Sequence, residues 1–379
     1  LQTYAEPELR SGHNILKPLT SFLQGYFDFK ERLGDAYGFT YVLEYAPQFQ
    51  WDFRLDGTTH ANDETNIILR WTPGDPANIK GGNLSTWFQV SRTLGSLNTS
   101  EFMAETGVIS PLNGGDTAPG DYNDLIQMIA WEQWFYKERL RLGLGKLTTR
   151  TFLNLNRYAT GDREDFFTPM LVNNPVVPFT ARNGMGLFSQ YHWDAVYLTG
   201  MLREADGTTT GIDLSTIDSG NWEYAFELGL TPANLGGLGE GYYRIMGYYT
   251  DSIGYDASYQ PAGWAMALSF DQDIGSRLGA LVRYSWASET YRAFKQRLAL
   301  GLQIKTPFRF QYDRIGLGAW WGDATSPEVD DEYGLEAYWK LQLAPFLELT
   351  PDFQVILNPQ GDQNRDAVII GGLRLRVVL

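Results

Sequence analysis

The 379-residue sequence contains no cysteine, and this absence excludes a disulfide framework and any thiolate metal site. It also lacks a continuous apolar run close to the roughly 18 residues that a membrane-spanning helix requires. The net charge is -15, which argues against nucleic acid because phosphates attract a basic surface. Histidine occurs only three times, and none stands in a supported nucleophile–base arrangement. We therefore expect no enzyme, no catalytic residue, no metal and no cofactor.

Aromatic residues and glycine are abundant, with 22 Tyr, 21 Phe, 12 Trp and 40 Gly. Aromatic girdles at the two interfaces of a membrane would use such rings. A soluble sandwich or propeller can have a similar composition, so composition alone does not separate the two classes.

The segment 221–230 alternates strictly between apolar and polar residues. Trp222 and Phe226 fall on one parity, and Glu223 and Glu227 fall on the other. A strand directs successive side chains to opposite faces, so such a segment has one apolar and one polar face. The same period recurs at 39–45, 66–71, 84–90, 139–144, 243–249, 264–270, 278–286, 297–305, 333–343, 353–358 and 373–379. Repeated segments of about ten residues with this period are typical of a transmembrane β-barrel.

The alternative is a soluble antiparallel sandwich whose apolar faces meet inside. Two observations favour the barrel: the polar parity often carries Gly and Ala, and the alternation continues to the last residue. Connections also divide into short ones, such as 305–313, and long ones, such as 95–122. We predict an all-β fold, a transmembrane antiparallel β-barrel of about sixteen strands with long extracellular loops over residues 36–379. A separate segment over residues 1–35 could hold a short helix and be either periplasmic or a plug.

Several short motifs occur in a fixed order along the chain. They are LRLGLGKL at 140–147 followed by Phe152 and Asn156, DRIGLG at 313–318, EYGLEAYW at 332–339, LTPDFQ at 349–354, NP at 358–359 and GLRL at 372–375. In this order the motifs resemble those of the carbohydrate-selective porin (OprB) family.

The resemblance implies a sugar-permeable channel of sixteen strands in the bacterial outer membrane, with no cofactor. It also implies that an inward-folded loop narrows the pore, and it suggests a monomer. The expected partners are small sugars, outer-membrane lipid and lipopolysaccharide, and the barrel assembly machinery, with no nucleic acid.

A sugar presents hydroxyls around a ring that also has an apolar face, so a sugar pore needs donors, acceptors and aromatic surface without tight binding. The segment 148–183 is long and mixes charged and aromatic residues. We interpret it as a pore constriction; the alternative is an ordinary extracellular loop with solvated charges. The candidate constriction residues are Arg150, Asn154, Asn156, Arg157, Asp162, Arg163, Glu164, Asp165 and Phe166.

A second set of charged residues falls on the polar parity of the predicted strands. It comprises Arg139, Arg141, Glu223, Glu227, Arg283, Arg297, Glu332, Glu336 and Arg374. Arginines facing carboxylates would make a transverse field that orients polar solutes. The same residues could instead pair across the lumen and support a rigid wall.

Three functions agree with this sequence. The first is a channel for diffusion of small carbohydrates across the outer membrane. The second is a dedicated export or secretion pore for a polymer or a polypeptide, and the third is a soluble secreted sugar-binding β-protein.

Overall fold

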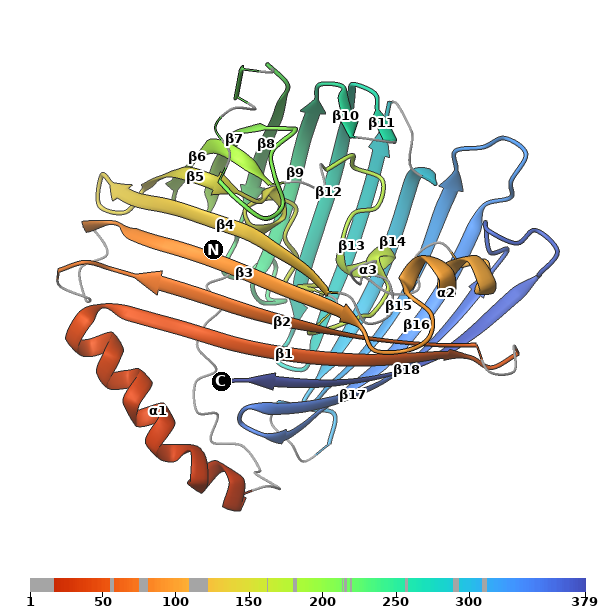
Figure 1. Ribbon diagram of the computed structural model, residues 1–379, viewed down its shortest axis with the longest axis horizontal. Coiled ribbons are helices and arrows are strands. Elements are labelled where there is room, and N and C mark those ends of the chain that lie inside the picture. Colours follow the sequence, from red (N-terminus) through yellow and green to blue (C-terminus); the bar gives the residue numbers. More distant parts are fainter. Residues whose placement is uncertain are drawn as a thin grey trace.

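The computed structural model describes residues 17–54, 58–74, 81–108, 122–161, 163–179, 183–212, 214, 217–218, 220–255, 258–288, 293–308 and 312–379. Sixteen strands of this part of the chain close into an antiparallel barrel (Figure 1). They are β1 (Phe39–Asp52), β2 (Thr59–Trp71), β3 (Asn83–Thr93), β4 (Tyr122–Phe135), β5 (Leu140–Leu147), β6 (Gly184–Trp193), β7 (Val196–Glu204), β8 (Trp222–Leu230), β9 (Gly241–Thr250), β12 (Gly263–Ile274), β13 (Leu278–Ala287), β14 (Phe294–Lys305), β15 (Arg314–Ala324), β16 (Glu332–Ala344), β17 (Leu347–Leu357) and β18 (Ala367–Val378).

Each barrel strand pairs with its neighbour in the chain, and β1 pairs with β18 to close the ring. The exceptions are β10 (Ile253–Tyr255) and β11 (Ser258–Gln260), which form their own two-stranded sheet between β9 and β12. The predicted antiparallel barrel of about sixteen strands is confirmed.

Strand β8 shows which parity faces the outside of the barrel. Glu223 and Glu227 are 0% and 1% exposed, whereas Phe226 and Leu228 are 52% and 43% exposed. The apolar parity therefore points outward, which is the reverse of a soluble sandwich. An outward apolar face agrees with a wall that meets lipid, while the polar parity points into the barrel.

The inward glycines have a packing role. Gly143, Gly229, Gly316 and Gly334 lie directly opposite Phe188, Tyr197, Tyr338 and Trp320 in the strand register. A Cβ atom on any of these glycines would overlap the ring of the residue opposite. Large aromatic side chains can therefore lie flat against the inner wall, which explains why glycine is frequent on the polar parity.

The two ends of the barrel differ in the length of their connections. One end carries the short turns 136–139, 194–195, 275–277 and 345–346. The other end carries the long connection 94–121, which includes α2 (Thr99–Thr106), and the long connection 148–183, which includes η2 (Thr149–Thr151) and α3 (Pro169–Val172). Short periplasmic turns and long extracellular loops are the usual arrangement of an outer-membrane barrel.

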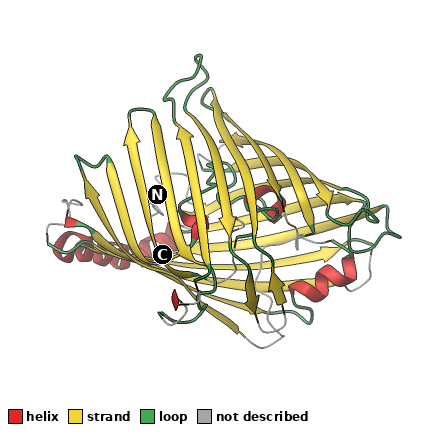
Figure 2. Cartoon of the chain, turned by 90° about the horizontal axis from the view of Figure 1, so that it is seen from above, coloured by secondary structure: helices red, strands yellow, loops and turns green. Residues whose placement is uncertain are grey.

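The predicted N-terminal helix is present as α1 (Lys17–Tyr37), and the barrel begins at Phe39. Figures 1 and 2 show α1 outside the wall formed by β1. The Tyr26 ring lies 6.3 Å from the ring of Tyr41, and the Phe27 ring lies 6.3 Å from that of Phe346. Residues 17–37 are thus not a plug in the lumen, while residues 1–16 fall outside the described part of the chain. None of the described helices is both long and apolar enough to cross a bilayer.

Candidate pore constriction

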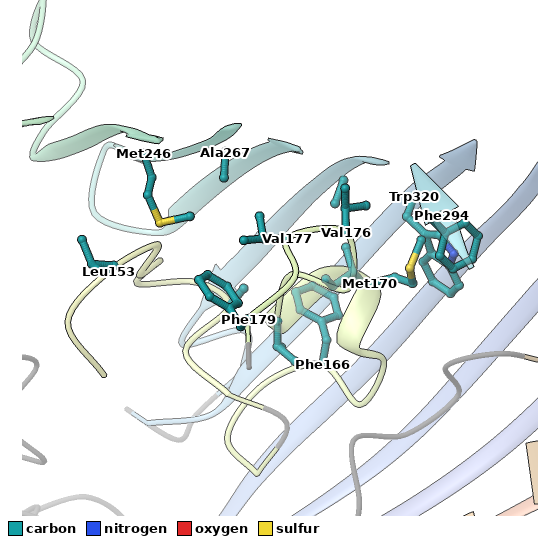
Figure 3. Packing of buried hydrophobic residues seen from close by; sticks show 14 of the residues in the cluster. Leu153, Phe166, Met170, Val176, Val177, Phe179, Met246, Ala267, Phe294 and Trp320 are labelled. Carbon is teal, nitrogen blue, oxygen red and sulfur yellow. The ribbon is translucent and has the colours of Figure 1, made fainter. Parts of the chain in front are cut away.

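We use the name inner loop for residues 148–161 and 163–179, which lie inside the barrel. Figure 1 shows α3 of this loop within the ring of strands. Figure 3 shows Met170 of α3 beside Phe294 and Trp320, while Val177 and Phe179 lie toward Met246 and Ala267. The fully buried apolar residues of the loop explain why it folds inward, because they leave water by packing on the wall.

Three arginines of the barrel wall bind backbone carbonyls of the inner loop. Arg283 donates to the carbonyls of Val172 at 2.6 Å and of Asn154 at 2.8 Å. Arg297 donates to the carbonyls of Met170 at 2.9 Å and of Asn173 at 2.6 Å. Arg374 donates to the carbonyl of Asp165 at 2.7 Å. These guanidinium groups are buried, and their charge-assisted bonds hold the loop in one position.

Three wall carboxylates bind donors of the same loop. Glu336 accepts the backbone N–H groups of Phe167 and of Thr168, the latter at 3.1 Å. Glu227 accepts the N–H of Asn154 at 2.7 Å. Glu223 accepts the Thr149 hydroxyl and also pairs with Arg203 at 2.6 Å.

These six wall residues share one role, and we call them the clamping residues. They are Glu223, Glu227, Arg283, Arg297, Glu336 and Arg374. The arginines bind backbone carbonyls, Glu227 and Glu336 accept backbone N–H groups, and Glu223 accepts a hydroxyl. Among the predicted lumen charges, these six chiefly bind the inner loop instead of one another.

Charged side chains of the inner loop reach other strands. Arg163 binds Glu44 at 3.1 Å and Glu64 at 2.6 Å, which joins the loop to β1 and β2. Glu164 binds Arg376 of β18 at 2.7 Å. Burial alone would raise the pKa of the Glu164 carboxyl, but Arg376 and Lys340 outweigh burial and lower that pKa from 4.5 to about 2.

The middle of the loop is attached to β12 and its surroundings. Arg157 pairs with Asp271 and, at 2.8 Å, with Glu240. The Asn156 amide donates to the Ser269 hydroxyl at 3.2 Å, and the Asp165 carboxylate accepts the Tyr338 hydroxyl at 3.2 Å.

The structure brings most of the candidate constriction residues together. Asn154, Asn156, Arg157, Arg163, Glu164, Asp165 and Phe166 all lie in the inner loop against the wall. Arg150 lies in η2 with an exposed side chain, and Asp162 lies outside the described residues.

The other three predicted lumen charges lie away from the clamp. Arg139 is in the turn between β4 and β5 and is exposed, so it is not a lumen residue. Arg139 has the predicted parity, but strand β5 begins one residue after it, at Leu140. Arg141 is in the lumen and pairs with Glu132 at 2.6 Å. Glu332 accepts the N–H of Gln360 at 3.2 Å, in the connection between β17 and β18.

A different part of the inner wall carries partly exposed side chains. We call it the open wall; it consists of Arg70, Trp87, Gln89, Gln127 and Trp134 on β2, β3 and β4. The guanidinium of Arg70 lies 5.9 Å from the Trp134 ring, and that of Arg141 lies 5.4 Å from the same ring. Gln127 donates to Gln89 at 2.5 Å.

The open wall was missed in the sequence analysis, although Trp134 shares its parity with the inward Glu132. The register between β3 and β4 shifts at Trp87/Phe88, and this shift interrupts the alternation around Gln127. Among the described residues, no group of three or more His, Asp or Glu side chains could hold a metal ion.

Known proteins resemble this chain in sequence and in structure. The family model for the carbohydrate-selective porin, OprB family, matches residues 76–379. The high pH structure of Pseudomonas putida OprB aligns with a TM-score of 0.75 at 14% identity, and covers 93% of this chain and 97% of that one. The low pH structure of the same protein aligns with a TM-score of 0.60 at 12% identity, and covers 94% of this chain and 97% of that one.

A curated relative is porin AaxA of Chlamydia pneumoniae, which is 27% identical over 149 residues. That match covers 37% of this chain and 33% of the relative, so it spans about a third of the relative's length. The porin from Chlamydia abortus is 25% identical over 144 residues, with a similar share. The structural matches are too distant in sequence to show more than the fold. The family model covers most of the chain and the barrel agrees with it, so this chain belongs to the carbohydrate-selective porin family, OprB family, of the bacterial outer membrane.

Proposed function

We propose that this protein is a channel through which small carbohydrates diffuse across the outer membrane, and that the inner loop forms its constriction. The observation that carries the proposal is the clamp: charged wall residues on β8, β13, β14, β16 and β18 fix the loop inside the barrel. A fixed loop divides the lumen and leaves a passage of defined shape, which a selective pore needs.

The open wall supplies the chemistry for a sugar on the side of the passage away from the clamp. The Trp134 ring can stack on the apolar face of a sugar, and the partly exposed Arg70 guanidinium beside it can donate to hydroxyls. Gln89 and Gln127 add amide donors and acceptors. None of these groups closes around a solute, so contact would be weak and passage fast.

The second function, an export pore for a polymer or polypeptide, would require the inner loop to leave the lumen. At least three buried arginines and three buried glutamates bind that loop, and releasing it would leave them without these partners. The clamp therefore favours a passage for small solutes.

Swelling of proteoliposomes tests this function. We expect liposomes that contain the protein to swell faster in glucose than in charged solutes of similar size. A protein that admits neither kind of solute, or that admits both equally, would contradict a sugar-selective channel. The sequence-based expectations of a monomer, of lipopolysaccharide contact and of the assembly machinery stay predictions.

A further inference from the structure

Helix α1 carries apolar side chains that the barrel does not cover. Tyr26 and Phe27 pack on the barrel, whereas Phe22 and Phe29 are 81% and 49% exposed. Phe22 and Phe29 are about two helical turns apart, so they lie on one side of the helix. That side adjoins the face that bears Tyr26, which is four residues from Phe22 and three from Phe29.

The other flank of the same helix is polar. Gln24, Asp28, Glu31 and Arg32 are exposed, and the Gln24 amide donates to the Asp28 carboxylate at 2.8 Å. Helix α1 therefore has three faces: one against the barrel, one apolar and exposed, and one charged. Such a division is typical of a helix that lies in the plane of a membrane interface.

The position of α1 on the barrel agrees with such a plane. Its Tyr26 and Lys30 contact the ring of Tyr41, at 6.3 Å and 4.9 Å from the ring centre, respectively. Tyr41 has the outward parity of β1, as do the exposed Leu43 and Tyr45. The helix thus lies on the lipid-facing side of the wall.

The height of α1 along the barrel is given by Phe27. This residue contacts Phe346 in the turn between β16 and β17, at the end that carries the short turns. Short turns are periplasmic in outer-membrane barrels, so α1 lies at the inner margin of the apolar belt. The exposed Phe22 and Phe29 continue that belt.

We propose that α1 is an interfacial helix whose Phe22–Phe29 flank inserts among phospholipid acyl chains of the periplasmic leaflet. This surface is separate from the proposed sugar passage. Continuity with the lipid-facing belt favours phospholipid over a second copy of the chain, and the charged flank then faces the periplasm.

Spin labels can test the insertion because the sequence contains no cysteine. Single cysteines would be introduced in the full chain by Phe22→Cys and Phe29→Cys on the apolar flank, and by Gln24→Cys and Glu31→Cys on the charged flank. Each labelled protein is reconstituted in phosphatidylethanolamine–phosphatidylcholine liposomes and checked for glucose flux.

The readout is the ratio of collisions with oxygen, which concentrates in the bilayer, to collisions with a water-soluble nickel chelate. We expect this ratio to be severalfold higher at positions 22 and 29 than at positions 24 and 31. Equal ratios on the two flanks would overturn the proposal. So would spin–spin broadening at positions 22 and 29 that disappears on dilution with unlabelled chain, because a second copy would then cover the flank. Glucose flux is independent of α1 insertion in this proposal, so either result leaves the sugar channel to be tested separately.

Discussion

Two parts of the inner wall use similar residues for different purposes. The clamping residues on β8, β13, β14, β16 and β18 are fully buried, and all of them except Glu223, which binds the Thr149 hydroxyl, bind the backbone of the inner loop. The open wall on β2, β3 and β4 also carries arginine and polar side chains, but these stay partly exposed. The side chains of the clamping residues bind groups of the protein. The side chains of the open wall are accessible to a solute in the lumen.

The difference shows that charge in a lumen does not by itself mark a solute site. A buried arginine that donates to carbonyls, as Arg283 does, has both terminal nitrogens of its guanidinium bound to the loop. A partly exposed arginine beside an indole ring, as Arg70 is beside Trp134, can exchange water for a hydroxyl. Exposure and the identity of the partner separate the two roles.

Removal of the middle of the inner loop should have the largest effect on the channel. Deletion of residues 156–166 takes away the attachments of Asn156, Arg157, Arg163, Glu164 and Asp165. We expect single-channel conductance to rise severalfold and discrimination between sugars to fall, because the lumen is no longer divided.

The control for this deletion is removal of the exposed residues 234–238 at the short-turn end, between β8 and β9. This control should retain the conductance of the unmodified channel. If deletion of residues 156–166 left conductance and sugar flux unchanged, the inner loop would not be the constriction.

The substitution Glu336→Ala tests one member of the clamp. It leaves the N–H groups of Phe167 and Thr168 without their acceptor, and a buried unpaired group costs about 1–3 kcal/mol. We expect the loop to fluctuate, which planar-bilayer recordings would report as rapid current noise. Glu332→Ala lies on the same strand and parity but affects the N–H of Gln360, so it should not add this noise. Equal noise in the two variants would refute a specific role for Glu336.

The open wall is tested by Trp134→Ala. Loss of an aromatic surface is worth about 0.5–1.5 kcal/mol, so we expect the half-saturating sugar concentration to rise about threefold to tenfold. Trp131→Ala is the matched control, because Trp131 is on the same strand with its side chain 38% exposed on the outer face. Sugar titration of the ion current measures both variants. A similar shift in both, or none at position 134, would show that the open wall does not contact sugar.

The smallest effect is expected from pH. The Glu164 pKa is lowered from 4.5 to about 2, so its ion pair with Arg376 stabilises the loop at pH values above the unfolded value. That contribution falls as the pH drops from about 4.5 toward 2, because the unfolded state takes up the proton first. We expect current noise to be constant from pH 7 to 5 and to rise at lower pH, and Glu164→Gln should weaken this change. An identical pH profile in Glu164→Gln would exclude Glu164 as its source.

The barrel could be predicted from the sequence because the alternation is local. On β8, the alternation of Trp222, Glu223, Tyr224 and Phe226 already predicts which side chains share a face of the strand. The structure confirms this prediction. The presence of an N-terminal helix was also readable, whereas its packing on the outside of β1 depends on contacts between distant residues.

The partners of the charged residues could not be predicted in the same way. Glu336 meets Phe167 only because the inner loop crosses the lumen, and nothing local to either residue encodes that path. Arg139 has the correct parity but lies in the turn just before β5, a boundary that alternation does not define. Trp134 lies in β4, which is not among the segments predicted from alternation, and a shift in the register between β3 and β4 interrupts the period there.

The most direct test is the single-channel current of the unmodified protein, titrated with glucose, maltose and charged solutes of similar size. If sugars pass between the inner loop and the open wall, glucose and maltose should reduce the ion current in a saturable way, and the charged solutes should not. An ion current that no sugar reduces, or the absence of any open channel, would contradict a sugar passage at this site.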